Sequence, residues 1–160
     1  MAPDDPAVLA GSLAGMARCR RRNGQYTLAR QYLIQALRAA GPNPGRRIPI
    51  ELRLVQLQVE VEQFRDADML LEEVHDEIQG AGWLRAAYLD VKADLLLARG
   101  HNAEAMRHAR KAVALALPAH DPVTALQARS TLSVVWMHEV RFDRAAREAA
   151  MARRYSGTDA

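Results

Sequence analysis

Two short arrangements of reactive side chains could carry chemistry in this sequence. Cys19 stands between Arg18 and Arg20, and neighbouring cations favour the nucleophilic thiolate form of a cysteine. Glu104 and His108 are four residues apart, which places a carboxylate and an imidazole on one helix face. The sequence supplies no partner base for the thiol, and two ligands do not make a zinc site. We therefore expect no catalytic residue, no enzyme activity, no metal and no other cofactor.

Arginine side chains offer a second kind of chemistry, the binding of anions. Arg18, Arg21 and Arg22 share one helix face, and guanidinium groups hold carboxylates through paired hydrogen bonds. The formal net charge is only +3, whereas phosphate binding requires a concentrated basic surface. We therefore consider direct nucleic-acid binding unlikely on sequence grounds.

The overall composition is typical of one globular domain. The chain has 160 residues, of which 49% are hydrophobic and 26% are charged. Cys19 is the single cysteine, which excludes an intramolecular disulfide and fits a reducing cytoplasm. The acidic, proline-containing start differs from a signal peptide, and no apolar stretch is long enough for a membrane span. We expect a cytoplasmic protein that does not enter the membrane.

The elements that position these side chains follow from an internal repeat. Ala29, Ala67, Ala105 and Ala145 recur at intervals of 38, 38 and 40 residues. Three residues before them stand Tyr26, Phe64, Asn102 and Phe142, and twelve residues before them stand Ala17, Val55, Ala93 and Ser133. Seven residues after them stand Ala36, Val74, Ala112 and Ala152. A repeat of this period predicts stacked helix–turn–helix units.

Glycine and proline mark the ends of the expected helices. We expect helices at 6–22, 25–40, 48–62, 64–78, 84–99, 102–117, 122–138 and 141–155. They form four repeats, 6–41, 46–80, 83–118 and 121–155, in a single domain over 1–160. The segment 48–54 alternates like a strand, but its place in the repeat decides for helix. The predicted fold is an all-α superhelix of about eight helices.

Small residues are expected where the two helices of a repeat cross, since only a small side chain lets the backbones approach closely. The aromatic residue three positions earlier is expected to fill the gap beneath the turn. The predicted packing residues are Ala17, Tyr26, Ala29, Phe64, Ala67, Ala93, Ala105, Phe142 and Ala145.

These patterns make the chain resemble a tetratricopeptide repeat protein. The matching stretches include Gly24-Gln-Tyr26-Thr-Leu-Ala29 and Gly100-His-Asn102-Ala-Glu-Ala105. The repeats are longer than the usual 34 residues, and Asn102 replaces an aromatic residue. Long repeats of this kind are similar to those of large bacterial transcriptional activators. The resemblance implies a scaffold that binds a protein or peptide in its concave groove, or alternatively the sensor or oligomerisation segment of a bacterial transcriptional regulator.

In tetratricopeptide repeat proteins the first helix of each repeat lines the groove, and the resemblance implies the same arrangement here. Arginine side chains would hold anions of the partner, and Asp90 and Asp94 would hold its cations. The carboxylate clamp of the co-chaperone members is missing from the matching positions. The predicted groove residues are Arg18, Arg21, Arg22, Arg53, Gln56, Glu60, Asp90, Asp94, Gln127, Ser130, Val134 and His138.

The last expected helix carries an apolar face that no polar capping helix follows. Repeat arrays normally end in such a cap. Three arrangements would cover the face: further repeats, another protein, or a homodimer formed through this C-terminal helix.

Overall fold

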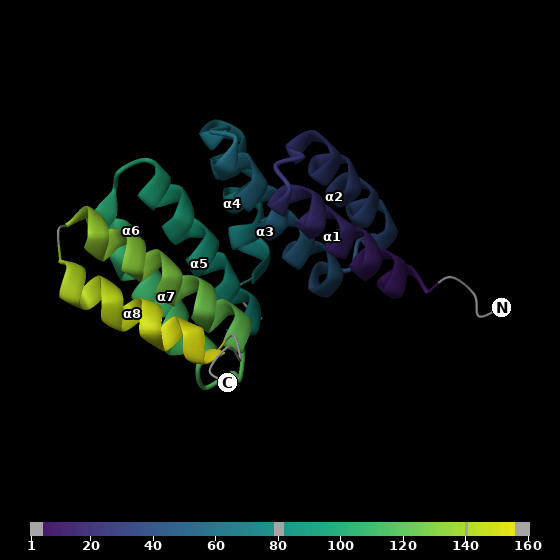
Figure 1. The fold of residues 1–160 in the computed structure, drawn as a ribbon. Helices are drawn as coiled ribbons and strands as arrows, with labels where there is room; N and C mark the ends of the chain where they lie inside the picture. Colours follow the sequence, from purple (N-terminus) through teal and green to yellow (C-terminus); the bar gives the residue numbers. More distant parts are fainter. Residues whose placement is uncertain (1–4, 79–81, 140, 156–160) are drawn as a thin grey trace. The chain divides into compact units, whose positions relative to one another are not determined.

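A computed structural model describes residues 5–78, 82–139 and 141–155, and these residues form eight α-helices in four helix–turn–helix pairs (Figure 1). The predicted all-α class and helix number are confirmed. The helices group into two compact units, Met1–Glu77 and Ile78–Ala160, where the sequence predicts a single domain. We describe each unit by itself.

Unit 1 contains α1 (Pro6–Arg22), α2 (Tyr26–Ala40), α3 (Pro44–Glu60) and α4 (Phe64–Glu77). The pairs α1–α2 and α3–α4 are the first two repeats, and α3 packs against both helices of the first pair. Its core is made largely of alanines of α1 and α2, with Ile50 and Leu57 inserted from α3. The second pair is therefore held by the apolar surface of the first.

Unit 2 contains α5 (Gly82–Ala98), α6 (Asn102–Ala116), α7 (Pro122–His138) and α8 (Phe142–Tyr155). The first helix of the second pair, α7, packs against both α5 and α6. Ala125 of α7 joins Ala86 and Ala116, and Leu132 of α7 joins Ala93 and Ala109. The packing order of unit 1 is thus repeated in unit 2.

Proline begins several of these helices. Pro6 and Pro122 follow Asp5 and Asp121, whose carboxylates accept hydrogen bonds from backbone N–H groups of the first turn. Helix α3 begins at Pro44, four residues before the expected start at 48, because proline is also well suited to the first helical position. The strand-like segment 48–54 lies inside α3, so the repeat is the better guide there.

The alanines expected at the helix crossings are all buried: Ala17, Ala29, Ala67, Ala93, Ala105 and Ala145. The aromatic positions behave less uniformly. Tyr26 is 40% exposed rather than buried, because it is the first residue of α2 and lies at the turn. Phe64 is half-buried, and the Phe142 side chain lies outside the described residues. Alanine packing, rather than aromatic filling, is the constant feature of the repeats.

The turn within a repeat closes in the same way in the first three repeats. The backbone N–H groups of Gln25, Gln63 and His101 donate back to carbonyls in the last turn of the preceding helix. The residue before each has positive φ: Gly24 (71°), Glu62 (60°) and Gly100 (80°). A residue with a Cβ is strained in this conformation, so Glu62 occupies a position that favours glycine.

We expect Glu62→Gly to stabilise unit 1 by about 1 kcal/mol, since glycine adopts the left-handed conformation without strain. Chemical denaturation followed by circular dichroism measures this change. Glu72→Gly is the matched control: Glu72 is exposed on α4, where glycine should cost about 1 kcal/mol. A loss of stability in both variants would contradict the strain at Glu62.

Candidate functional site

Basic side chains of unit 1 gather on the first helices of its two repeats. Arg18, Arg21 and Arg22 occupy the last two turns of α1. Arg53, Gln56 and Glu60 follow one another along one face of α3, and α1 packs against α3. Unit 1 therefore brings together the predicted groove residues of its two repeats. We call Arg18, Arg21 and Arg53 the basic cluster.

The three guanidinium groups of the basic cluster act on one another. Partial burial lowers the pKa of Arg53, and the positive charges of Arg18 and Arg21 lower it further. Arg21 Nη1 lies 3.3 Å from Glu60 Oε1, so Glu60 supplies one carboxylate to the cluster. Arg20 points its guanidinium elsewhere and donates to Gln25 Oε1 at 2.9 Å. Like charges held this close favour an anionic ligand that carries more than one carboxylate.

Asp90 is not the surface anchor that the sequence predicts. Its side chain is only 1% exposed on α5, because this face of the helix is turned into unit 2. Burial raises the pKa of Asp90 well above its usual range, and the nearby Asp94 and Asp121 raise it further. A carboxyl group buried in this way cannot reach a partner's cation, so this prediction is wrong.

The other predicted groove residues of unit 2 do not form one site. Asp94 accepts a hydrogen bond from Thr131 Oγ1 at 2.7 Å, which ties α5 to α7. Gln127 is half-buried and its backbone carbonyl also accepts from Thr131. His138 is exposed in the last turn of α7. Ser130 and Val134, by contrast, both line a groove between α7 and α8.

The α7–α8 groove is an open hollow of about 420 Å³. Its surface is mostly apolar, with serine hydroxyls from α7 and one guanidinium from α8. The lining residues are Leu126, Ser130, Ser133, Val134, Ala149, Ala152 and Arg153. Small side chains along both helices leave room for a further side chain or helix.

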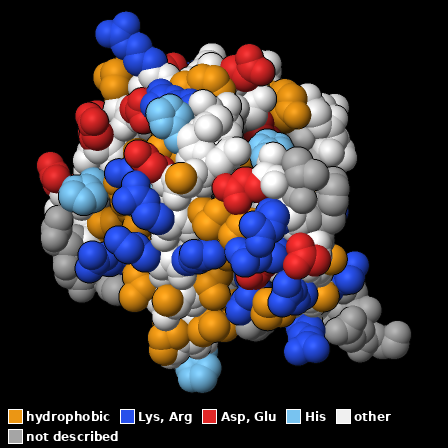
Figure 2. Space-filling view, turned by 90° about the vertical axis from the view of Figure 1, so that its left-hand side faces the viewer, with side chains coloured by type: hydrophobic (Ala, Val, Ile, Leu, Met, Phe, Trp, Pro, Cys, Tyr) orange, Lys and Arg blue, Asp and Glu red, His pale blue; other side chains and the backbone are white. Residues whose placement is uncertain are grey.

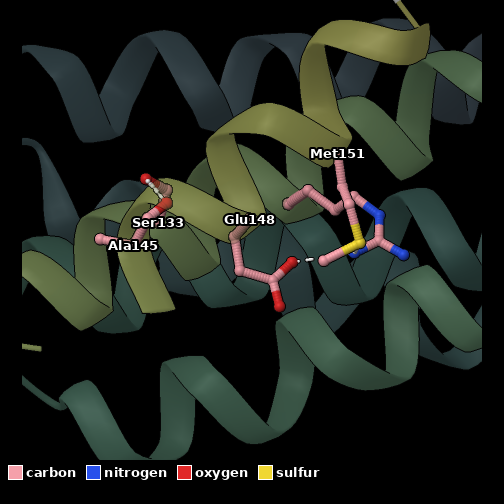
Figure 3. A network of polar contacts seen from close by, with 5 residues as sticks. Ser133, Ala145, Glu148 and Met151 are labelled. Carbon is pink, nitrogen blue, oxygen red and sulfur yellow. Dashed lines mark hydrogen bonds and ion pairs between the residues drawn. The ribbon is translucent and has the colours of Figure 1, made fainter. Parts of the chain in front are cut away.

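Polar contacts hold α7 and α8 together beside this groove (Figure 3). Ser133 Oγ donates to the carbonyl oxygen of Ala145 at 3.0 Å. Arg129 Nη1 lies 2.8 Å from Glu148 Oε2 and 3.2 Å from Met151 Sδ. The Arg129–Glu148 pair is largely buried, with side chains 14% and 20% exposed. These contacts fix the spacing of the two helices that form the groove.

The reactive residues of the sequence do not come together. Cys19 is exposed on α1, and no group of three or more His, Cys, Asp or Glu side chains suited to a metal occurs among the described residues. Glu104 lies 3.8 Å from Arg107, and His108 is half-buried. No helix within the described ranges is long and apolar enough to span a membrane.

Charges of both signs share the surface in the view of Figure 2. Lys and Arg side chains lie there among acidic, histidine and hydrophobic side chains. A protein that tracks a phosphate backbone usually presents a more uniform basic surface. This face is better suited to a partner of mixed charge.

The sequence predicts Ser130 and Val134 as groove residues of α7 and an uncovered apolar face on the last helix, which includes Ala149. It does not predict that these two features form one groove between α7 and α8. A signal was present, since each residue of the groove has an equivalent 40 residues earlier in the third repeat.

No family model matches the sequence, and no curated protein matches it. Among solved structures, the chain is similar to the crystal structure of BtubC (BKLC) from P. vanneervenii, with a TM-score of 0.64 and 19% sequence identity. The similarity covers 98% of this chain and 66% of that chain, so this chain spans about two thirds of the length of BtubC. At this identity the likeness shows the helical fold alone.

Proposed function

We propose that this chain is a noncatalytic interaction module whose basic cluster holds an acidic segment of a partner protein. The observation that carries the proposal is the convergence of Arg18, Arg21 and Arg53 from two successive repeats. Burial is the largest cause of the lowered pKa of Arg53, and the charges of Arg18 and Arg21 lower it further, so an acidic ligand would relieve their repulsion. The proposal places the module in the cytoplasm, where its exposed Cys19 stays reduced.

An acidic peptide fits the cluster better than nucleic acid does. Glu60 lies within the cluster, and its pairing with Arg21 interrupts the continuous basic surface that a phosphate backbone requires. A peptide can place carboxylates on the arginines and still leave Glu60 paired with Arg21. Gln56, half-buried on α3 between Arg53 and Glu60, adds an amide that can bind a peptide backbone.

The resemblance to tetratricopeptide repeats supports the same proposal, since first helices line the binding groove in that family. The alternative, a sensor or oligomerisation segment of a bacterial transcriptional regulator, requires a ligand-dependent change in repeat packing. An acidic peptide that binds without altering the helix packing would favour the interaction module.

The test is a binding titration with a short glutamate-rich peptide that carries a fluorophore. We expect Arg18→Gln combined with Arg53→Gln to weaken binding about tenfold, since each exposed ion pair contributes up to about 1 kcal/mol. The Arg21–Glu60 pair stays intact in this variant. Fluorescence anisotropy at several salt concentrations measures the change.

The matched control is Arg30→Gln combined with Arg38→Gln. Both arginines are exposed on α2 of the same unit, so the net charge changes equally. Binding by the control variant should stay close to that of the unchanged chain. Equal weakening in both variants would mean that only overall charge attracts the peptide, and would overturn the proposal.

A further inference from the structure

The two units contain the same type of helix-binding surface. In unit 1, α3 inserts Ile50 and Leu57 into the surface formed by α1 and α2, and Leu54 packs against its edge. That surface includes Ala10, Ala14, Ala17, Leu33, Ala36 and Leu37. It is where the first repeat receives the first helix of the second.

In unit 2, the surface formed by α5 and α6 receives α7 in the same manner. Ala125 of α7 packs on Ala86, and Leu132 of α7 packs on Ala93 and Ala109. Val113 borders this contact, and Asp94 accepts the hydrogen bond from Thr131. The α5–α6 positions that pack with α7 or hydrogen-bond to it are therefore Ala86, Ala93, Asp94, Met106, Ala109, Val113 and Ala116.

The α7–α8 groove is the third copy of this surface. Equivalent residues of the third and fourth repeats are 40 positions apart, as Ala105 and Ala145 are. Adding 40 to Ala86, Ala93, Asp94, Ala109 and Val113 gives Leu126, Ser133, Val134, Ala149 and Arg153, which are five of the seven residues that line the groove. The groove therefore has the form of a binding surface for the first helix of a repeat.

The chain also exposes a helix face of the matching type. Residues of α1 and α7 are equivalent at a spacing of 116, as Ala29 and Ala145 are. The face of α7 that packs into unit 2 carries Ala125, Ala128, Leu132 and Val135, which are 0–3% exposed. The equivalent residues of α1 are Leu9, Ser12, Met16 and Cys19, and all four are exposed.

The exposure of these α1 residues contrasts with the burial of their equivalents on α7. Leu9 is 47% exposed and Met16 is 43% exposed, whereas their equivalents Ala125 and Leu132 are 0% and 3% exposed. Val8, beside Leu9, is 66% exposed, while its equivalent Thr124 is buried. One face of α1 therefore exposes apolar side chains to water. The equivalent positions of α7 are buried in the contact of α7 with α5 and α6.

We propose that α1 of a second copy of this chain binds in the α7–α8 groove, so that the copies associate head to tail. The incoming helix takes the place that α7 occupies on α5 and α6. Ser130 and Ser133 keep the backbones close, and Val134 offers an apolar contact where the third repeat has Asp94. The two surfaces differ, so the contact is heterologous and can extend to chains of several copies.

The first test is sedimentation of the complete chain over a wide concentration range. We expect the average mass to rise with concentration, and Met16→Arg to weaken association at least about tenfold, since it puts a charge into an apolar contact. Met69→Arg is the matched control: Met69 is 54% exposed on α4, outside both surfaces. Circular dichroism checks that each variant remains helical.

The second test separates head-to-tail binding from a symmetric dimer. Ser130→Arg blocks the groove but leaves α1 unchanged, and Ala114→Arg, exposed on α6 outside the groove, is its control. Met16→Arg and Ser130→Arg should each be monomeric alone. Their mixture should form a dimer of one copy of each, because one variant keeps the groove and the other keeps α1.

Failure of the mixture to associate, with both variants monomeric alone, would overturn the proposal. Self-association of Met16→Arg with Ser130→Arg monomeric would also overturn it, and would indicate a symmetric contact through the groove. A chain that stays monomeric at every concentration would also overturn it, and would assign the groove to another partner. Protection of Cys19 from alkylation as the concentration rises would support it, because the equivalent Val135 is fully buried. The result does not depend on the basic cluster.

Discussion

Replacing Trp136 by alanine is expected to destabilise unit 2 by about 3–5 kcal/mol, because it removes a large aromatic side chain from the core. Trp136 is 6% exposed on α7 and is the largest buried side chain among the described residues of the unit. Arg110 of α6 and Arg144 of α8 lie over its ring at 5.5 and 4.8 Å from the centroid. One side chain therefore links three helices through burial and cation–π contacts.

Denaturation followed by circular dichroism measures this effect, because unfolding of unit 2 removes the helical signal of α5 to α8. Trp136→Phe is the control: it keeps an aromatic ring of smaller size, so we expect a clearly smaller loss. Arg144→Met measures the cation–π contribution by itself. We expect it to lower the free energy of unfolding by about 0.5–1 kcal/mol, because Arg144 is exposed. A loss below about 1 kcal/mol for Trp136→Ala would contradict the central role of this residue.

The fold could be predicted because the repeat depends on local features that every unit shares. Small residues mark the helix crossings, and glycine or proline marks most helix ends. These local features predict the eight helices even when the surfaces against which they pack are unknown. The predicted start of α3 is four residues too late, because the sequence pattern treats Pro44 as part of the turn between two helices. Proline is also well suited to the first position of a helix. Tyr26 was misjudged because the pattern gives the residue type but not its exposure.

The site could be predicted only in part, since exposure depends on which helix comes next. Arg18 and Arg21 of α1 lie near Arg53 of α3 because α1 packs against α3 within unit 1. Asp90 lies on the equivalent stripe of α5 but is buried in unit 2. The α7–α8 groove follows from repeat equivalence, but only after the structure shows which surfaces receive a helix.

Replacing the buried Asp90 by asparagine is expected to make unit 2 more stable at neutral pH, by about 1–3 kcal/mol. Asp90 Oδ1 is buried without a hydrogen-bond partner within the described part of the chain. An asparagine at this position would keep the shape of the side chain but could not ionise. Tryptophan fluorescence during denaturation, repeated over a series of pH values, measures the difference.

The sign follows from the raised pKa of Asp90, which burial causes first and the charges of Asp94 and Asp121 increase. The unfolded chain releases this proton at about pH 4, while the folded chain keeps it to higher pH. The stability that Asp90 contributes is therefore fully present below about pH 4 and is lost as the pH rises through the folded pKa. The two chains should have similar stability in acid and diverge as the pH rises.

Asp66→Asn is the matched control, because Asp66 is exposed on α4 of unit 1 and should leave the unfolding of unit 2 unchanged. An advantage of Asp90→Asn that stayed constant with pH would mean that shape or hydrogen bonding, not ionisation, causes it. An advantage that grew toward acid would contradict the raised pKa. Only a gain that increases with pH agrees with a carboxyl group that α5 keeps protonated inside unit 2.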